Sequence, residues 1–270
     1  MALFSSSFPS SSPSFLLNNS IGKTQKSRNF ISFRFNFNIF KDRSLLNVKE
    51  AFSEDELWAT AFWILITITL KHAAMIPIKC IYMLKPEINN LDHIKYLAER
   101  EFDALKERIA GKRIGFKRVS CINATVPLSQ MSNSSDDLCS VCKYSDNGED
   151  RIVIGSLDLN QCLRLPDEIT GKRPEGLGSD IGRAYLSNVC VAKELQKNGV
   201  GSKVVAKSKI VAQEWGITDL YVHVAVDNEP ARKLYLRSGF TYEDDEPSWQ
   251  ARFLDRPRRI LLWTDVSGSL

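Results

Sequence analysis

The sequence predicts a mixed α/β (α+β) fold, and two patterns of apolar residues carry this prediction. Within 86–111, apolar residues recur at three- and four-residue steps, as on one face of an amphipathic helix. Within 219–226, apolar side chains alternate between two sides, as in a β-strand. Because patterns of both kinds follow one another along 270 residues, we expect helices packed on a sheet in one or two domains.

The elements are expected in the following order. A helix spans 86–111, opened by Pro86 and ended by Gly111. Strands rich in β-branched residues follow at 116–126 and 151–162, separated by a Ser/Asp/Asn-rich loop over 128–150. A second loop with two prolines and four glycines covers 163–182. The remainder is read as strand 184–191, helix 201–215, strand 219–226, helix 228–238 and strand 259–266.

An apolar stretch at 57–84 precedes these elements. Its first 14 residues carry no charge, whereas Lys71, His72 and Lys79 interrupt the rest. A membrane-spanning helix needs about 20 apolar residues, and Lys71 and His72 would lie near the bilayer centre at a cost of several kcal/mol. We therefore favour a buried or peripheral helix; a membrane anchor and a segment foreign to the fold are the alternatives.

Residues 1–50 are predicted to be a plastid transit peptide. Residues 1–41 contain ten serines, five basic residues and no acid, and they lack the long apolar run of a secretory signal. Asp42 is the first acidic residue, so cleavage is expected at about 42–56, and the catalytic domain is expected at 86–270. A merely disordered tail is the alternative.

Charge and cysteine content exclude several other classes. Without the five basic residues of the first segment, 31 basic residues face 32 acidic ones, which does not fit a basic nucleic-acid binder. Six cysteines are too few for a disulfide scaffold of this length. Cys139 and Cys142 form one CxxC pair, which supplies only two of the four ligands of a structural zinc. We therefore predict no metal site.

The candidate binding site is the glycine turn at 196–201 (QKNGVG), between an expected strand and an expected helix. Glycines allow a tight turn and a close approach of a ligand, and amides at a helix N-terminus bind phosphate. Ser202 and Lys203 follow Gly201 in the wrong order for a Walker loop, and the three-glycine dinucleotide spacing is absent. The kinase motifs HRD and DFG are also absent.

The spacing around this turn resembles the GNAT superfamily of N-acetyltransferases. Val191 precedes Gln196 by five residues, and Asn228 stands seven residues before Tyr235 in NEPARKLYLRSGF. The resemblance covers about 115–266 and is strongest to the plastid subgroup of plant GNAT enzymes, which is associated with acetylation of protein N-termini and lysines. It implies a GNAT fold, with a mostly antiparallel, centrally splayed sheet flanked by helices, and acetyl-CoA as co-substrate.

The resemblance also implies residue roles. Backbone groups of Val189, Cys190 and Val191 would run beside the pantetheine arm, and one of their amides would stabilise the oxyanion. The pyrophosphate would be held by Lys197, Asn198, Gly199, Val200, Gly201 and Ser202. The following helix would contact the cofactor through Asp227, Asn228, Glu229 and Tyr235. Tyr235 would protonate the departing thiolate, since a phenol with a pKa of about 10 is protonated at working pH.

The base that deprotonates the acceptor amine is less clearly marked. Some relatives carry a carboxylate five residues before the Asn, where this chain has His223. His223 is therefore a candidate base, and a hydrogen-bonded strand histidine is the alternative that we favour. Asp158 is a second candidate, although we expect it to be an ordinary exposed strand acid.

Two other features are read more plainly. Cys190 lies beside the expected thioester, so an acyl-cysteine route is conceivable, but we expect it to present only its backbone. A basic cluster near the C-terminus is expected to be a solvated rim, with docking of a cofactor phosphate or an acidic acceptor as the alternative; it consists of Arg252, Arg256, Arg258 and Arg259.

Together these observations predict a plastid, stromal enzyme that moves acetyl directly from acetyl-CoA to protein α-amines, with lysine ε-amines as second acceptors. The alternatives are acetylation of a small amine such as a polyamine or arylalkylamine, an acetyl-CoA-binding module without turnover, and a membrane-bound scaffold organised by 57–84. No nucleic-acid partner is expected, and membrane anchoring is not favoured.

Overall fold

The computed structural model describes residues 43–75, 91–113, 115–130, 142–162, 182–191 and 195–268. Its strands are β1 (Asn47–Glu50), β2 (Phe116–Pro127), β3 (Lys143–Asp146), β4 (Glu149–Cys162), β5 (Arg183–Val191), β6 (Asp219–Ala225), β7 (Thr241–Asp245) and β8 (Arg259–Asp265). Its α-helices are α1 (Glu54–Met75), α3 (Leu91–Ile109), α5 (Val200–Glu214), α6 (Glu229–Arg237) and α7 (Ser248–Phe253). Short 3₁₀ turns, η2 and η3, lie at Arg43–Leu45 and Leu128–Gln130.

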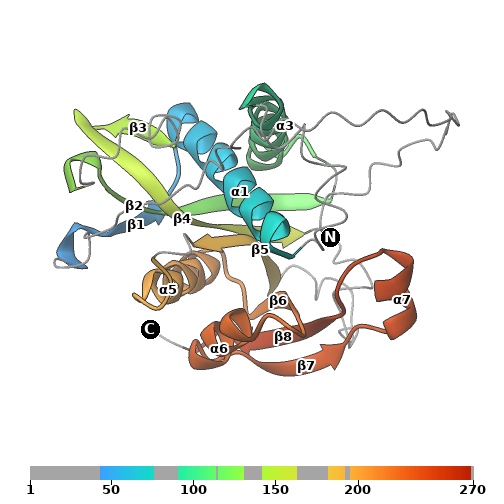
Figure 1. Cartoon of the computed structure of the whole chain (residues 1–270). Helices are drawn as coiled ribbons and strands as arrows, with labels where there is room; N and C mark the ends of the chain where they lie inside the picture. Colours follow the sequence, from blue (N-terminus) through green and yellow to red (C-terminus); the bar gives the residue numbers. More distant parts are fainter. Residues whose placement is uncertain are drawn as a thin grey trace, which may run out of the picture.

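The strands form one eight-stranded sheet in the order β1-β2-β4-β5-β6-β8-β7, with β3 paired to β4. Helices α1 and α3 lie over one face of the sheet, and α5 and α6 lie on the other (Figure 1). Of the strand pairs in the described residues, β5 with β6 alone runs parallel; the others are antiparallel. The predicted mixed fold and mostly antiparallel sheet are thereby confirmed.

The central parallel pair is short, and its strands diverge. Residues 183–186 of β5 pair with 219–222 of β6, whereas β5 continues to Val191 and β6 to Ala225 without further pairing between them. The predicted central splay is therefore present, and it opens toward the glycine turn that leads into α5.

Most predicted elements occur within one or two residues of their expected bounds. This holds for β2, β4, β5, β6 and β8 and for helices α5 and α6. Helix α3 begins at Leu91, and 86–90 and 163–181 lie outside the described residues. The loop expected over 128–150 is wrong in part, because it contains β3 and the start of β4. Strands β1 and β7 and helix α7 were not predicted.

Helix α1 contains most of the apolar stretch. A helix that is apolar on all sides requires burial on all sides, and α1 packs between α3 and the strands β3 and β4. Phe62, Trp63 and Ile64 are each no more than 2% exposed. This packing supports the buried-helix alternative for 57–66. Among the described residues, no helix combines the length and apolarity needed to cross a membrane, and 76–84 lie outside them.

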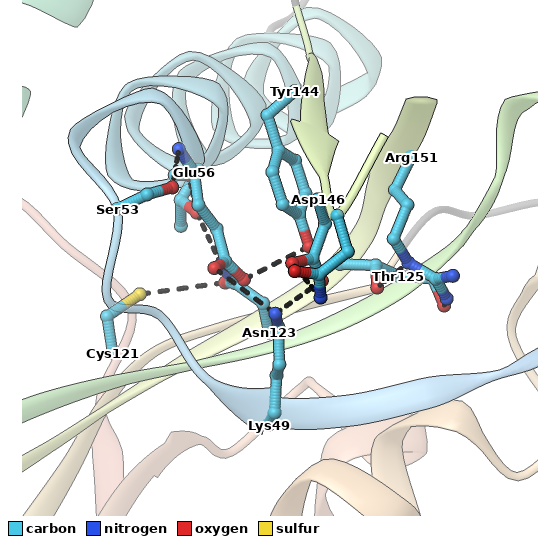
Figure 2. A network of polar contacts seen from close by, with 11 residues as sticks. Lys49, Ser53, Glu56, Cys121, Asn123, Thr125, Tyr144, Asp146 and Arg151 are labelled. Atoms are coloured by element: carbon cyan, nitrogen blue, oxygen red, sulfur yellow. Dashed lines mark hydrogen bonds and ion pairs between the residues drawn. The ribbon is translucent and has the colours of Figure 1, made fainter. Parts of the chain in front are cut away.

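A buried carboxylate anchors the start of α1 (Figure 2). Glu56 is 2% exposed and accepts hydrogen bonds from Asn123 Nδ2 at 3.2 Å and the Tyr144 hydroxyl at 3.3 Å, with Lys49 Nζ at 4.0 Å. Ser53 Oγ accepts from the Glu56 N–H at 3.1 Å, as an N-cap does. Burial raises the pKa of Glu56. One side chain thus joins α1 to β1, β2 and β3.

Candidate active site

The end of β5 forms one wall of the candidate site and carries a β-bulge. Opposite β4, Cys190 pairs with Ser156 and Ser187 pairs with Asp158, so β5 has one residue more than β4 in this interval. Asn188, inside the bulge, has a φ of 51°, in the left-handed region. Because a bulge redirects backbone groups of its strand, the amides after Asn188 do not follow the alternation of a regular ladder.

The N-terminus of α5 forms a second wall. Gly199 is its N-cap, with a φ of 82°, and neither a side-chain cap nor an acidic residue occupies the first turn. Lys197, two residues earlier, also has a positive φ of 65°. The first amides of a helix have no acceptor within the helix, so the N–H groups of 200–202 and the positive end of the helix dipole suit an anion.

Two glycines let these walls approach closely. A Cβ on Gly201 would lie 3.1 Å from Leu234 Cδ2 of α6. A Cβ on Gly155 of β4 would lie 3.3 Å from the Cys190 carbonyl oxygen and 3.2 Å from Val200 Cγ1. These distances leave no room for an added methyl group where three elements meet: the predicted thioester-binding strand, the predicted phosphate-binding turn and α6.

Tyr235 lies on α6, one residue after Leu234, which approaches Gly201. The Tyr235 side chain is 4% exposed, and its ring packs edge-on against Phe240 with 5.5 Å between centroids. Burial raises the pKa of Tyr235, and the neighbouring Tyr185 and Cys190 of β5 raise it further. The phenol is therefore protonated at physiological pH and available as a proton donor.

His223 is hydrogen-bonded rather than poised as a base. Its Nδ1 lies 3.2 Å from the hydroxyl of Tyr185 on the neighbouring strand. Burial lowers the pKa of His223 to about 3, and the nearby Arg259 lowers it in the same direction. Since an efficient general base has a pKa near the working pH, this supports the alternative of a strand histidine. Tyr185 was not predicted as a site residue, because a tyrosine within a strand has the sequence signature of a core residue.

Replacing His223 with glutamine is expected to change kcat by less than about threefold, because the wild-type imidazole is neutral and a weak base. A buried neutral histidine contributes stability above its unfolded pKa of about 6.5, and this contribution is lost as pH falls toward the folded value. The difference in melting temperature between wild type and His223→Gln should therefore shrink from pH 7 to pH 4. A kcat loss of a hundredfold would instead assign the base to His223.

The three predicted cofactor contacts around the start of α6 have different environments. Asn228 is the N-cap of α6, and its Oδ1 accepts from the Ala231 N–H at 3.3 Å. Glu229 is exposed and pairs with Lys233 at 2.8 Å; the hydrogen bond from Lys233 lowers the pKa of Glu229. Asp227 is also exposed. Asn228 therefore has a capping role of its own, and the two carboxylates face solvent.

The expectation for Asp158 is wrong. Its side chain is fully buried rather than exposed, and it pairs with the Arg108 guanidinium of α3 at 3.4 Å. Burial raises the pKa of Asp158, and Arg108 and Asn188 oppose this rise. The sequence contains no local signal for this burial, because the ion pair joins residues 50 positions apart.

The C-terminal arginine cluster is mostly paired within the chain. Arg256 and Arg259 bind the carboxylate of Glu246, and Arg258 pairs with Asp245. Burial alone would raise the pKa of Glu246, but the hydrogen bonds from Arg256 and Arg259 lower it to about 2. Arg252 and Arg258 are exposed, as expected for a solvated rim, whereas Arg256 and Arg259 are partly buried.

The described residues contain no group of three or more His, Cys, Asp or Glu side chains that could hold a metal ion. Of the CxxC pair, Cys142 is buried and Cys139 lies outside the described residues.

The chain is similar to a known family and to several known proteins. Residues 120–240 match the acetyltransferase (GNAT) family. The chain is 59% identical over 229 residues to GCN5-related N-acetyltransferase 7, chloroplastic, of Arabidopsis thaliana, covering 84% of this chain and 79% of that protein. It is 28% identical over 151 residues to the Arabidopsis chloroplastic GCN5-related N-acetyltransferase 6, covering 53% of this chain and 47% of that protein. Among solved structures, YncA of Salmonella typhimurium with acetyl-CoA matches with a TM-score of 0.48 and 13% identity, covering 83% of this chain and 96% of that one.

Proposed function

The chain belongs to the GNAT family of acetyl-CoA-dependent acetyltransferases, and from this premise we propose that it acetylates the α-amines of protein N-termini, with lysine ε-amines as second acceptors. The observation that carries the proposal is the uncapped N-terminus of α5 beside the splayed, bulged end of β5. When bound, acetyl-CoA supplies an acetyl group activated as a thioester. The remaining steps are assigned to residues of this chain.

The pyrophosphate of acetyl-CoA would be held by the turn before α5. The amides of Val200, Gly201 and Ser202 lack a side-chain cap, and Lys197 adds a positive charge close by. Asn228 uses its oxygen for capping, which leaves Nδ2 as a donor for the cofactor. These features fit a diphosphate, because backbone amides at a helix N-terminus and one lysine supply donors and positive charge.

The thioester end would lie against residues 189–191. One of the amides that follow the bulge would donate a hydrogen bond to the thioester carbonyl, where negative charge develops during transfer. Tyr235 would give its proton to the departing sulfur, since its raised pKa keeps the phenol protonated. Cys190 would contribute its backbone, because Tyr235 and the amides leave no step that needs an acyl-cysteine.

The acceptor is inferred from the environments of the two candidate bases, His223 and Asp158. His223 has a pKa of about 3, and Asp158 is paired with Arg108. An α-amine, with a pKa of about 7.7–8.0, is largely neutral at a slightly alkaline pH, whereas lysine at about 10.4 is not. This favours N-terminal α-amines over lysine.

A small polycation fits the described site less well. A polyamine pocket requires unpaired carboxylates, but the carboxylate of Glu246 is paired with Arg256 and Arg259. The similarity to chloroplastic relatives supports a plastid location and a removable N-terminal segment, as the composition of 1–41 also does. The pairing of β1 with β2 supports cleavage before Asn47, in the first part of the 42–56 window.

The proposal is tested by incubating the purified protein with acetyl-CoA and matched peptides, and by following thiol release. One peptide has a free N-terminus and no lysine; the other is N-terminally blocked and has one lysine. We expect faster turnover with the first, and a rate that rises to about pH 8 and then levels off as the α-amine deprotonates. Equal or greater rates with spermidine would favour the small-amine alternative, and no thiol release with any amine would favour a binding module.

Replacing Gly199 with valine is expected to weaken coenzyme A binding at least tenfold. A β-branched residue at φ 82° is strained, so the turn and the first amides of α5 would shift away from the phosphates. Gly216 is a matched control, because it has a φ of 73° at the other end of α5 and open space where a Cβ would lie. Gly216→Val should lower the melting temperature by a similar amount and leave the calorimetric Kd within about twofold. Equal affinity losses in both variants would contradict the phosphate role of the turn.

A further inference from the structure

A buried ion pair lies directly behind the β5 bulge. Asp158 of β4 is fully buried, and Arg108 of α3 is 3% exposed. Arg108 Nη1 lies 3.4 Å from Asp158 Oδ2. None of the roles assigned above to the site residues uses either side chain. Burying two charges costs desolvation energy, so stabilisation of the fold does not by itself explain this ion pair.

The guanidinium of Arg108 is held on three sides. Its Nε donates to the Ala104 carbonyl oxygen at 3.2 Å, and its Nη2 donates to Glu101 Oε1 at 3.1 Å. Both partners belong to α3, so the orientation of the guanidinium is set by the helix. The third nitrogen group, Nη1, is thereby directed at β4 and positions the Asp158 carboxylate.

Asp158 in turn holds the residue that makes the bulge. Asn188 Nδ2 donates to Asp158 Oδ2 at 2.8 Å. Asn188 is the one residue of β5 with a positive φ. It lies in the interval in which β5 has one residue more than β4. Asparagine enters the left-handed region more readily than most residues, but the conformation persists only where surrounding contacts hold it.

We propose that Asp158 is a positioning residue, which with Arg108 fixes the left-handed conformation of Asn188 and so aims the β5 amides at the thioester carbonyl. This inference rests on the proposed role of the amides at 189–191. The physical reason is the geometry of a strand, in which a one-residue change of register turns every following group to the opposite side. If the tether to Asn188 is lost, β5 can relax toward a regular ladder in which these amides point elsewhere.

The test compares acetyl-CoA with coenzyme A, which lacks the carbonyl that the amide would bind. Asn188→Ala removes both the tether and the residue suited to a positive φ. We expect calorimetry to show that its preference for acetyl-CoA over coenzyme A falls about threefold to tenfold, as for loss of one hydrogen bond. Its affinity for coenzyme A itself should stay within about twofold, and kcat should fall at least tenfold. Asn188→Gly, which permits a positive φ, should retain more activity than Asn188→Ala.

Variants of Asp158 separate positioning from proton transfer. Asp158→Asn keeps an oxygen that can accept from Asn188, so kcat should stay within about threefold of wild type. Asp158→Leu has no acceptor and should behave as Asn188→Ala does. An Asp158→Asn variant as inactive as Asp158→Leu would overturn the proposal and point to the carboxylate as a base. Should Asp158→Leu not fold, Asn188→Ala, whose side chain is only half-buried, decides the question.

Arg151 supplies the control for a purely structural effect. Like Asp158, it is a buried residue of β4, but it lies toward the other end of that strand. Its guanidinium pairs with Glu149 and donates a hydrogen bond to Thr125 Oγ1. Arg151→Met should lower the melting temperature and leave the ligand preference unchanged. The preference for acetyl-CoA is measured by binding alone, so it separates the proposed function from the positioning role of Asp158. A wild type that binds acetyl-CoA preferentially but releases no thiol contradicts the proposed function only. An unchanged preference in Asn188→Ala contradicts the positioning role.

Discussion

Tyr235→Phe is expected to lower kcat at least a hundredfold while the affinity for coenzyme A stays within about twofold. A positioned general acid contributes about 10²- to 10⁴-fold to a rate, and the substitution removes only the hydroxyl. Phenylalanine retains the ring that packs against Phe240, so the fold and the phosphate-binding turn should be preserved. Thiol release under saturating acetyl-CoA measures kcat, and calorimetry measures binding.

The pH dependence gives this prediction a second readout. Because burial raises the pKa of Tyr235, the phenol stays protonated through the range in which it acts. The wild-type rate should therefore show no falling limb below about pH 10, the usual pKa of a phenol. A rate that declines between pH 8 and 9.5 would show that the acid is another group, as would full activity in Tyr235→Phe.

Tyr144 is the matched control for Tyr235. It is also a buried tyrosine, and burial raises its pKa to about 12, but it lies on β3 and donates to Glu56. Tyr144→Phe leaves the Glu56 carboxylate with one donor fewer, so it should reduce stability by about 1–3 kcal/mol, as for a lost bond to a charged group. It should not change kcat. A similar kcat loss in both variants would indicate a general effect of removing a buried hydroxyl.

The parts of the fold that were predictable have signals that are local in the sequence. Strand β6 alternates Leu220, Val222 and Val224 on one face, and these residues lie in the main core. Helix α5 repeats its apolar residues with helical spacing and begins at a glycine pair. Such patterns persist in the structure because burial of one face is the dominant energetic requirement for each element.

The elements that were missed lack a local signal. Strand β7 (TYEDD) is acidic and mostly exposed, and it is a strand only because β8 pairs with it at the sheet edge. Strand β3 lies in a polar stretch and is held by β4 and by the contact of Tyr144 with Glu56. No periodicity within four or five residues distinguishes such a strand from a loop.

The same distinction applies to the site. The glycine turn and Tyr235 could be proposed as candidates because their spacing is visible along the chain. The environment of Asp158 was not, since its burial depends on Arg108 in another helix and on Asn188 in a neighbouring strand. Likewise, nothing in the sequence indicates that His223 is partly buried beside Tyr185 and near Arg259, where its pKa is lowered.

A protein that begins at Leu57 is expected to melt at least about 10 °C below one that begins at Lys41. The shorter chain lacks β1, whose residues 47–50 pair with 122–125 of β2. It also lacks the Ser53 cap of α1 and the Glu56 carboxylate to which Asn123 donates (Figure 2). A lost cap costs about 1 kcal/mol, and an unsatisfied buried amide about 1–3 kcal/mol. A loss of about 3 kcal/mol lowers the melting temperature by about 10 °C in a domain of this size.

Glu56→Gln separates the charge of this residue from its place in the network. Glutamine keeps the acceptor for Asn123 and removes the charge that faces Lys49 at 4.0 Å. It should therefore lower the free energy of unfolding by less than half as much as the truncation to Leu57 does. The Lys49 amine has a second partner, Asp146, at 2.5 Å, which limits the loss. If β1 belongs to the functional protein, the native N-terminus identified by mass spectrometry lies before Leu45, whose carbonyl oxygen accepts from Arg151 at 3.4 Å. Equal melting temperatures for the two chain lengths, together with a native start beyond Glu50, would exclude β1 from the mature fold.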